Sequence, residues 1–350
     1  MTVEPAQSTA LIADESAVAA DPASHRVLTG DRPTGPLHLG HYFGTLRNRV
    51  RLQSLGVDTY LVVADYQVIT DRQSPGEIAA NVSEVVLDNL AVGMDSERTT
   101  IFPHSQIRAL NQLMLPFLSL VSVAELQRNP TVKEEAEAAG ISSISGLLLT
   151  YPVHQAADIL FCHGTLVPVG DDQLPHVEQT RLIARRFNDR YAGGRQVFTE
   201  PQALLSPAPR LLGVDGRKMS KSRNNAIEIR ATEDVTARLI RRAVTDADRR
   251  ITYDPDSRPG VSSLLMMAAL VTERSPHEVA DDIGSRGASA LKAHVTEVVN
   301  EHLRPIRRRR AELAADPGIV PAVLHAGAEK ATADAEQTLQ HVHDALGMKY

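Results

Sequence analysis

The chain has 350 residues, 43% of them hydrophobic, so it is long enough to bury a large core as one large domain or two. Its single cysteine, Cys162, excludes a disulfide within the chain and any metal site built from cysteines alone, so we expect a reducing, cytoplasmic location. A formal net charge of -6 argues against indiscriminate nucleic-acid binding, although a local basic surface could still bind RNA.

Residues 1–24 are rich in alanine and acidic side chains and show little periodicity, so we expect them to form a disordered tail. They lack the basic-then-apolar layout of a secretion signal. No apolar run along the chain approaches the length needed to cross a bilayer, so we expect no membrane partner.

A glycine-rich segment at residues 30–41 (GDRPTGPLHLGH) follows a short apolar run and opens an amphipathic stretch at about residues 37–52. The segment therefore lies where a strand turns into a helix, and such a turn can bind phosphate because free backbone N–H groups and the helix dipole point at the anion. His38 and His41 share one helix face and can donate hydrogen bonds to phosphate oxygens, while Gly40 leaves room for an adenine ring on the backbone. An ordinary helix start would show the same pattern, so this segment alone does not establish a phosphate-binding site.

Strands and helices alternate through the first half of the chain. The expected strands are residues 27–28, 59–64, 99–102 and 165–169, and the clearest helical patterns between them are residues 78–90 and 172–190. This alternation predicts an α/β fold with a doubly wound parallel sheet and helices on both of its faces. Ligands bind such sheets at the carboxyl ends of the strands, where residues 30–41, 65–67 and 170–173 fall.

Three polar residues, Tyr151, Gln155 and Asp158, are spaced so that they project from one helix face. The alternative is a polar stripe facing solvent, but the rest of this helix is apolar, which favours the lining of a cavity. Asp158 then offers a carboxylate to one donor on the side chain of a substrate. Because an unpaired buried acceptor costs about 1–3 kcal/mol, a substrate without such a donor is rejected.

A lysine- and serine-rich loop follows at residues 216–222 (GRKMSKS). Taken alone, a solvated surface loop is the simpler interpretation. However, Lys218 and Lys221 could also close over the oxygens of a leaving pyrophosphate while its bond breaks. Both segments in one chain, in this order, predict two halves of one ATP site in an enzyme that activates an acid by adenylation.

Beyond this loop the pattern is helical only. The expected helices are residues 233–248, 262–273 and 287–314, with a last one from about residue 320. Basic clusters occur at Arg181 with Arg185 and Arg186, at Arg238 with Arg241 and Arg242, and at Arg304 with Arg307, Arg308, Arg309 and Arg310. Each cluster alone is more simply a solvated helix face, but two of them in the C-terminal third favour RNA binding there.

Residues 38–41 (HLGH) and 218–222 (KMSKS) resemble the two signature motifs of class I aminoacyl-tRNA synthetases. Residues 146–160 (GLLLTYPVHQAADIL) and 167–173 (VPVGDDQ) are similar to the amino-acid pocket of bacterial tryptophanyl-tRNA synthetases, and the likeness runs from about residue 26 to the end of the chain. The resemblance implies a Rossmann-like catalytic domain of the HIGH/KMSKS type with a C-terminal α-helical domain, in a cytoplasmic homodimer. It also implies that L-tryptophan is activated with ATP, which carries Mg²⁺, and is transferred to tRNA(Trp).

The resemblance divides the chain into five parts. They are the tail at residues 1–24, the catalytic domain at 25–212, the KMSKS loop at 213–228, an α-helical tRNA anticodon-binding domain at 229–319, and a C-terminal helix at 320–350 that packs back on the catalytic domain.

The resemblance also implies roles for individual residues. The catalytic candidates are His38, His41, Lys218 and Lys221. The ATP-binding candidates are Arg32, Pro33, Thr34, Gly40, His41, Gly170, Asp171, Asp172, Leu211, Lys218, Met219, Ser220, Lys221 and Ser222. The tryptophan-binding candidates are Gln67, Tyr151, Gln155, Asp158, Val167, Val169 and Gln173, with Asp158 facing the indole N–H, and no metal bound by the protein is expected. For Asp171, an acidic residue favoured by the dipole at a helix start is the simpler interpretation.

Gln67 and Gln155 stand where the common bacterial pattern usually has a histidine and a methionine. Together with residues 31–35 (DRPTG), they resemble the auxiliary, second-copy form of the enzyme and suggest tolerance of inhibitors that are tryptophan analogues. Glu135 stands where the common form tends to carry a phosphate-directed lysine, which leaves Lys133 as the only lysine of its segment.

Three alternatives remain. A tyrosyl-tRNA synthetase could use the same polar stripe for a phenol hydroxyl. A small-molecule nucleotidyltransferase with a His-x-Gly-His motif would explain the first segment but not the lysine loop. A paralogue kept for binding or regulation would carry both motifs without activity.

Overall fold

The computed structural model describes residues 11–70, 76–138, 140, 143–205, 211–217, 219 and 225–350. Its strands are β1 (Arg26–Asp31), β2 (Asp58–Val63), β3 (Thr99–Pro103), β4 (Leu166–Val169) and β5 (Gln202–Leu205). The helices before the lysine loop are α1 (Glu15–Ala20), α2 (Leu39–His41), α3 (Arg47–Leu55), α4 (Ile78–Val92), α5 (Arg108–Leu118), α6 (Val123–Arg128), α7 (Pro130–Ala138), α8 (Gly146–Leu160) and α9 (Leu174–Arg190). Those after it are α10 (Glu233–Arg241), α11 (Pro259–Thr272), α12 (Pro276–Ile283), α13 (Gly287–Ala314) and α14 (Ile319–Leu346).

The described strands form one parallel sheet in the order β3-β2-β1-β4-β5. The chain first builds one side of the sheet with β2 and β3 and then crosses to the other side with β4 and β5. The carboxyl ends of β1 and β4 therefore flank the point where the strand order reverses, which is where sheets of this kind bind ligands. The predicted fold class, a doubly wound parallel sheet followed by helices, is confirmed.

The two faces of the sheet pack against separate cores. Leu61 and Val63 of β2 belong to a core that includes side chains of α4, α11 and α13. Tyr60 and Val62, which alternate with them, belong to a second core that includes side chains of α5, α8 and α9. Because successive side chains of a strand point to opposite faces, an apolar run such as that of β2 must be covered on both sides, as it is here.

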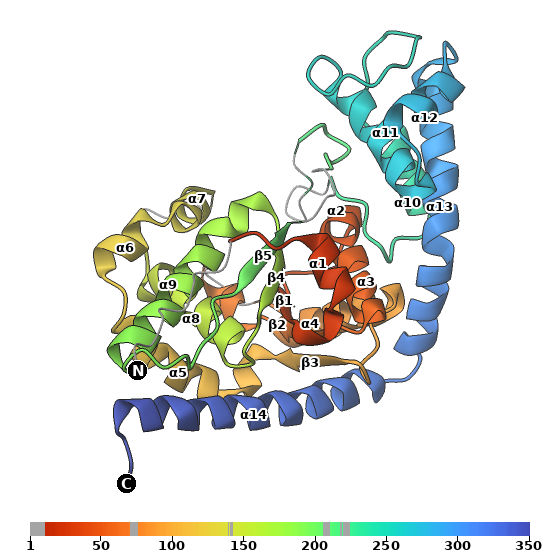
Figure 1. Cartoon of the computed structure of the whole chain (residues 1–350). Helices are drawn as coiled ribbons and strands as arrows, with labels where there is room; N and C mark the ends of the chain where they lie inside the picture. Colours follow the sequence, from red (N-terminus) through yellow and green to blue (C-terminus); the bar gives the residue numbers. More distant parts are fainter. Residues whose placement is uncertain are drawn as a thin grey trace.

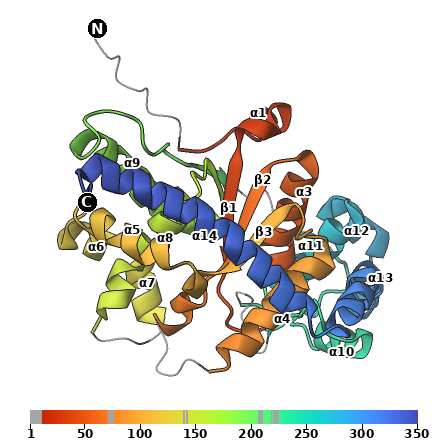
Figure 2. The same ribbon diagram turned by 90° about the horizontal axis from the view of Figure 1, so that it is seen from below.

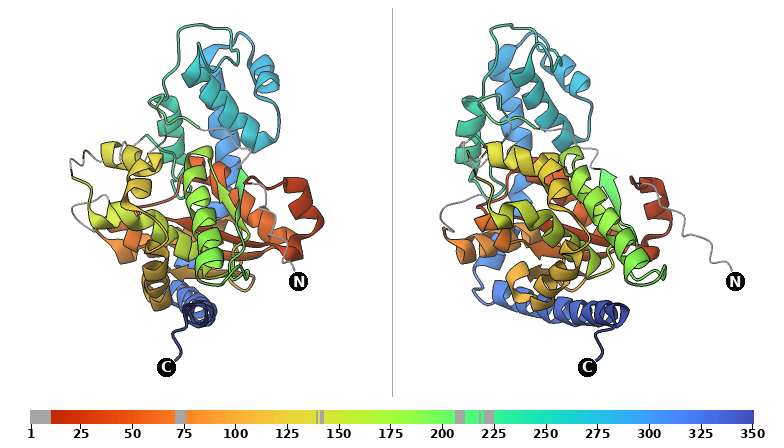
Figure 3. Two further views of the ribbon diagram at one scale, coloured as in Figure 1. Left: turned by 60° about the vertical axis from the view of Figure 1, so that its left-hand side comes forward. Right: turned by 90° about the vertical axis from the view of Figure 1, so that its left-hand side faces the viewer.

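The C-terminal helices leave the sheet and then return to it. Helices α10 to α12 stand above the sheet in Figure 1, and α13 runs down beside it to α14, which passes along the bottom. Figure 2, seen from below, shows α14 crossing the molecule beneath the strands, and Figure 3 shows the helices of the C-terminal third projecting from the top. Ala331 and Ala335 of α14 are fully buried in the second core. Through these residues, α14 belongs to the core that covers one face of the sheet.

Residues 11–24 do not form the disordered tail that their composition suggests. The backbone N–H of Ala13 donates to the carbonyl of Ala203 at 2.8 Å, and the N–H of Ala203 donates to the carbonyl of Leu11 at 2.7 Å, so the segment pairs with the free edge of β5. Val18 of α1 is buried against Val27 and other core residues. The expectation of disorder is therefore wrong for residues 11–24. This segment has little periodicity, but its pairing with a sheet edge and the burial of Val18 keep it ordered.

Several helices differ in extent from the sequence-based expectation. The helix expected at residues 37–52 is divided into α2 and α3 by a π-helical turn at Tyr42–Leu46. The helix expected at residues 233–248 ends at Arg241, and the chain that follows is held by Arg258, which donates two hydrogen bonds to the carboxylate of Asp246.

Candidate active site

The first motif and the base of the lysine loop lie side by side. The N–H of Leu39 donates to the carbonyl of Ile227 at 2.9 Å, and the N–H of Ile229 donates to the carbonyl of Leu37 at 3.0 Å. Met219 is buried, and its sulfur lies 3.6 Å from the position that a Cβ on Gly40 would take. The structure thus brings Met219 and residues 227–229 against the motif that begins α2. Lys218, Ser220, Lys221 and Ser222, which carry the predicted contacts to phosphate, lie outside the described residues.

The two ends of the lysine loop are fastened to each other. The N–H of Gly213 donates to the carbonyl of Arg217 at 2.7 Å, and the N–H of Val214 donates to the carbonyl of Asn225 at 2.9 Å. The side-chain amide of Asn225 donates to Asp215 at 2.7 Å. A Cβ on Gly213 would fall 2.4 Å from the Asn225 side chain, so only glycine allows this close approach.

The two motif histidines have defined orientations. Nδ1 of His38 accepts from the N–H of Gly40 at 3.1 Å, and Nδ1 of His41 accepts from the N–H of His38 at 3.2 Å. The ring centroids are 3.8 Å apart. Because Nδ1 is an acceptor in both rings, the proton of each neutral imidazole sits on Nε2. Both side chains can therefore donate from Nε2, which is the property that the predicted phosphate contacts require.

A cavity of about 360 Å³ opens at the carboxyl ends of β1 and β4. Of the candidates named from the sequence, Arg32, Gln67, Tyr151, Gln155, Asp158, Val167, Val169, Gly170, Asp172 and Gln173 line it. Pro33, Thr34, His38, Gly40, His41, Asp171, Leu211 and Met219 are described but are not part of its lining. All seven tryptophan-binding candidates therefore share one space, at the reversal point of the sheet.

Asp158 lies on the wall of this cavity and is almost completely buried. Its burial raises the pKa of the carboxyl group well above the usual range, and the nearby carboxylate of Asp65 raises it further. Oδ1 of Asp158 lies 3.0 Å from Nε2 of His104, which directly follows β3 and is itself fully buried. The ring of His104 in turn lies 3.9 Å, centroid to centroid, from that of His154 on α8.

Sequence reasoning missed His104 and His154. Single histidines beside a strand or on an apolar helix are usually core residues, so composition and spacing alone mark neither of them as functional. A usable signal was present for His104, because it follows a strand at the same edge of the sheet as the other candidate segments.

Tyr151 is oriented by another buried histidine, His176. Its hydroxyl lies 2.9 Å from Nε2 of His176, and Nδ1 of His176 faces the side-chain amide of Asn129 at 3.5 Å. Burial lowers the pKa of His176 to about 4, so this ring is neutral at pH 7. An amide N–H facing Nδ1 favours the proton on Nε2, from which His176 donates to the oxygen of Tyr151.

Arg32 lines the cavity and is held at several points. Its guanidinium donates to the carbonyl of Gln67 at 2.7 Å and to the hydroxyl of Thr70 at 3.0 Å, and it lies 3.6 Å from Glu135 of α7. Glu135 also lines the cavity, whereas Lys133 is exposed. Thus the glutamate at the unusual position is an ion-pair partner of Arg32.

The basic clusters named from the sequence differ in how far their charges are already neutralised. Arg181 and Arg185 pair with Glu200, and Arg186 pairs with Glu125, so the cluster on α9 is tied into the fold. In the C-terminal third, Arg304 pairs with Glu233, and Arg310 pairs with Asp88 and Glu84. Arg238, Arg242 and Arg309 are exposed.

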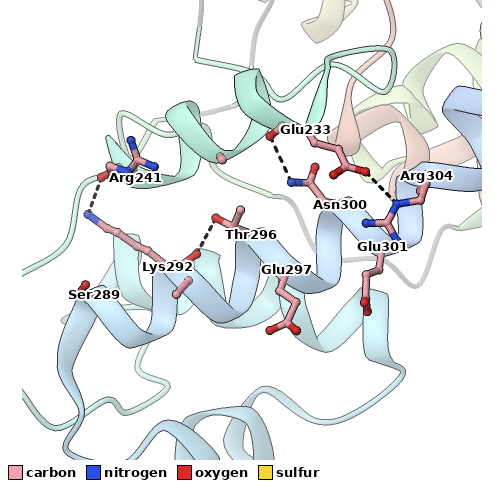
Figure 4. A pocket seen from close by; sticks show the side chains of 11 residues that line it. Glu233, Arg241, Ser289, Lys292, Thr296, Glu297, Asn300, Glu301 and Arg304 are labelled. Atoms are coloured by element: carbon pink, nitrogen blue, oxygen red, sulfur yellow. Dashed lines mark hydrogen bonds and ion pairs between the residues drawn. The ribbon is translucent and has the colours of Figure 1, made fainter.

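A surface groove of about 680 Å³ separates α10 from α13 (Figure 4). Lys292 donates to the carbonyl of Arg241 across it, and Asn300 donates to the carbonyl of Glu233. The charged residues that line it are Glu233, Glu297, Glu301, Arg241, Lys292 and Arg304. Acids and bases balance, so this groove has no net charge that would attract RNA.

Neither a metal site nor a membrane helix is found in the described part of the chain. No group of three or more His, Cys, Asp or Glu side chains among the described residues could hold a metal ion. None of the described helices combines the length and the apolar character needed to cross a bilayer.

Comparisons with known proteins agree with this architecture. Residues 21–304 match the family model of class I tRNA synthetases for tryptophan and tyrosine. The chain is 40% identical to a tryptophan–tRNA ligase of Clostridium longisporum over 337 residues, which cover 94% of this chain and 98% of that enzyme. It is 41% identical to the tryptophan–tRNA ligase of Treponema pallidum over 332 residues, which cover 92% and 97% of the two chains. The solved tryptophanyl-tRNA synthetase of Campylobacter jejuni, complexed with ADP and tryptophan, is similar with a TM-score of 0.78 and 29% identity, over 92% of this chain and 99% of that one.

Proposed function

The chain belongs to the family of class I tRNA synthetases for tryptophan and tyrosine, and we propose that it is a ligase that joins L-tryptophan to tRNA(Trp). One structural observation supports tryptophan as the substrate: the buried carboxylate of Asp158 lies on the wall of a cavity whose other sides include Val167 and Val169. A carboxylate among apolar walls suits a ring that carries one N–H donor. Tryptophan has this donor, and phenylalanine lacks it.

The reaction proceeds in two transfers. The carboxylate of tryptophan attacks the α-phosphorus of ATP, the bond from that phosphorus to the bridging oxygen breaks, and diphosphate leaves. A terminal hydroxyl of the tRNA then attacks the carbonyl carbon of tryptophanyl-adenylate, and AMP leaves. The substrate carboxylate is already a nucleophile at neutral pH, so the protein needs to align the reactants and to stabilise the added charge.

We assign the charge stabilisation to both motifs. His38 and His41 would donate from Nε2 to phosphate oxygens, while Lys218 and Lys221 would bind the leaving diphosphate. Mg²⁺ would enter as a complex with the triphosphate, whose oxygens are the hard ligands that it prefers. We also assign Tyr151 and Gln155 to the ammonium group of tryptophan, and Asp172 to a ribose hydroxyl.

We further propose that this chain is the auxiliary form of the enzyme and tolerates inhibitors that are tryptophan analogues. The support is that Gln67 and Gln155 both line the cavity, and that Gln67 is joined through its carbonyl to Arg32. A Gln67→His variant should be inhibited more strongly by an indole-based inhibitor than the parent. Equal inhibition of the two would contradict the proposal.

Three further assignments rest on the family. We propose that the helical region at residues 229–319 reads the tRNA anticodon, that the enzyme is a homodimer, and that it acts in the cytoplasm. Analytical ultracentrifugation would test the dimer, and a monomer at micromolar concentration would contradict it.

The exchange of pyrophosphate into ATP, measured with tryptophan and with tyrosine, tests the proposed function. Tryptophan should support exchange and tyrosine should not. The chain contains no tryptophan, so indole fluorescence also reports bound substrate with almost no background. Exchange with tyrosine alone would show a tyrosyl-tRNA synthetase, and no exchange with either amino acid would favour a paralogue kept for binding.

A further inference from the structure

Two buried histidines beside the cavity have no part in the mechanism described so far. His104 is fully buried after β3, and its Nε2 lies 3.0 Å from Oδ1 of Asp158. His154 lies on α8 one turn before Asp158, and its ring lies against that of His104, with 3.9 Å between centroids and 33° between the ring planes. The ring of Tyr66 stands edge-on to that of His104, with 5.7 Å between the two centroids.

Among the described residues, His104 is the possible side-chain donor that lies beside the Asp158 carboxyl group. Among the described residues no lysine or arginine forms an ion pair with Asp158, and His104 is the side chain recorded within ion-pairing distance of it. The other charged neighbour, Asp65, is a second carboxylate, held by the backbone N–H groups of Tyr66 and Ser105, and it repels the charge on Asp158. Without a donor, Asp158 would therefore favour its protonated form, which is a weaker acceptor.

The state of His104 follows from its surroundings. Burial lowers its pKa well below the usual range, with His154 lowering it further, so the ring is neutral and carries one N–H. Nδ1 and Nε2 of His104, Oδ1 of Asp158 and Nε2 of His154 form no hydrogen bond among the described residues. Nε2 of His104 and Oδ1 of Asp158 are thus two buried, unsatisfied polar atoms that lie 3.0 Å apart. A small rotation of either side chain would let a proton on Nε2 be donated to Oδ1 and would satisfy both atoms. The second oxygen of Asp158 is then the one left for a ligand in the cavity.

We propose that His104 is a positioning residue that fixes the Asp158 carboxylate for the ring N–H of the bound amino acid, and thereby sets the preference for a substrate with that donor. This inference rests on the proposed activation of tryptophan. It concerns how Asp158 is held, so it can fail while tryptophan activation stands.

The test compares tryptophan with β-(3-benzothienyl)alanine, an analogue that has sulfur in place of the ring N–H. Pyrophosphate exchange would be measured for the parent, His104→Phe and His104→Gln. Phenylalanine keeps an aromatic ring against His154 but removes the donor, and glutamine restores a donor. In His104→Phe, KM for tryptophan should rise about tenfold, the scale of one hydrogen bond to a charged group, with kcat unchanged and with little change in KM for the analogue. His104→Gln should recover most of the preference for tryptophan.

A matched control separates positioning from packing. His154→Leu removes the ring that lies against His104 but leaves His104 and Asp158 in place. The ratio of kcat/KM between tryptophan and the analogue should therefore stay at the parent value. The inference is overturned if His104→Phe changes both substrates equally or neither, if His104→Gln does not restore the preference, or if His154→Leu has the same effect as His104→Phe. Should His104→Phe not fold, His104→Leu is measured in its place with the same expected outcome. A parent enzyme that does not activate tryptophan would instead refute the proposed function.

Discussion

At the carboxyl end of β1, next to the first motif, Asp31 forms a buried ion pair with Arg49. Two guanidinium nitrogens contact the carboxylate at 2.6 and 3.0 Å, and Asn89 donates to it at 3.1 Å. Burial alone would raise the pKa of Asp31, but the charge and hydrogen bonds of Arg49 outweigh this, so the pKa lies below its usual range. We expect Arg49→Met to lower the free energy of unfolding by about 3–5 kcal/mol, because it leaves a buried carboxylate without its partner.

Urea unfolding at pH 7 measures this cost, and Arg51→Met is the control because its pair with Glu15 is exposed and should be worth about 1 kcal/mol or less. The pH dependence has a definite sign. A carboxyl group with a lowered pKa in the folded state stabilises fully above its unfolded pKa of 3.8, and this stability is lost as the pH falls through the folded value. In Arg49→Met the burial that raises the pKa of Asp31 is no longer opposed by Arg49. The difference between parent and variant should therefore begin to shrink as the pH falls through that raised value, and should continue to shrink below pH 3.8. Equal costs for the Arg49 and Arg51 variants would contradict the prediction.

His176, which donates to Tyr151, predicts a second pH effect of the same sign, because its pKa is also lowered in the folded state. Burial lowers its pKa from 6.5 to about 4, so between these values the unfolded chain binds a proton that the folded chain does not. Stability from this residue therefore rises with pH across that window, by up to about 1.4 kcal/mol per pH unit, and is constant above it. The difference in unfolding free energy between the parent and His176→Gln should rise from pH 4 to 6.5 and then level off. His104 and His154 are present in both proteins, so their contributions cancel, and a difference that does not change with pH would refute the assignment.

Among the elements, the contact of α14 with β3 is close enough to need a glycine. A Cβ on Gly327 would fall 1.9 Å from the carbonyl oxygen of Ile101, which is backbone and cannot move aside. We expect Gly327→Ala to lower the free energy of unfolding by about 3 kcal/mol, at the upper end of typical overpacking costs. Gly44→Ala is the control, since nothing lies within 4 Å of its Cβ and alanine is favoured over glycine in a helix by about 0.5–1 kcal/mol. Chemical denaturation compares the two, and a neutral Gly327→Ala would show that α14 can shift away from the sheet at little cost.

The elements also show what the sequence could predict. Four strands were recognised because each is a short apolar or β-branched run, and α13 was found with its bounds, residues 287–314. The strand β5 was missed because Gln202–Leu205 is short and contains no β-branched residue. Its place is decided by pairing with β4 and with residues 11–13.

The same division holds for the candidate site. Residues that lie on one helix, such as Tyr151 and Asp158, could be placed together by their spacing alone. His104 could not be, because its approach to Asp158 depends on β3 and α8 meeting at one edge of the sheet. Spacing along the chain predicts which side chains share a face of one helix. Contacts between elements that are far apart in sequence can be identified only once the folded structure is known.

On the scale of the whole molecule, the helical region is joined to the first motif through one carboxylate. Asp88 of α4 accepts from the N–H of Leu37 at 2.9 Å with one oxygen and from Arg310 of α13 at 2.6 Å with the other. Arg310 and Arg230 also converge on Glu84. A movement of α13 would therefore act on the turn that precedes His38 and His41. It also means that Arg310 is committed to the fold and is not free for RNA.

The basic residues that remain exposed predict where tRNA binds. Arg238 of α10 and Arg242, which follows it, are exposed, whereas Arg185 and Arg186 of α9 pair with Glu200 and Glu125. Each phosphate contact releases counterions, so the slope of log affinity against log salt decreases by about 0.7–0.9 for every contact removed. We expect the double variant Arg238→Gln, Arg242→Gln to weaken tRNA binding. It should also reduce this slope by the amount that corresponds to the loss of one to two phosphate contacts.

The matched control is the double variant Arg185→Gln, Arg186→Gln, which removes the same charge from the sheet domain. Its salt slope should equal that of the parent, because those guanidinium groups are already neutralised by carboxylates. Fluorescence anisotropy of labelled tRNA over a range of salt concentrations measures both. A smaller slope in the α9 variant would place the RNA on the sheet domain, and a flat response in the parent would remove all the arginine clusters from the interface. The net charge of -6 makes the comparison informative, because attraction to RNA must then come from local surfaces and not from the molecule as a whole.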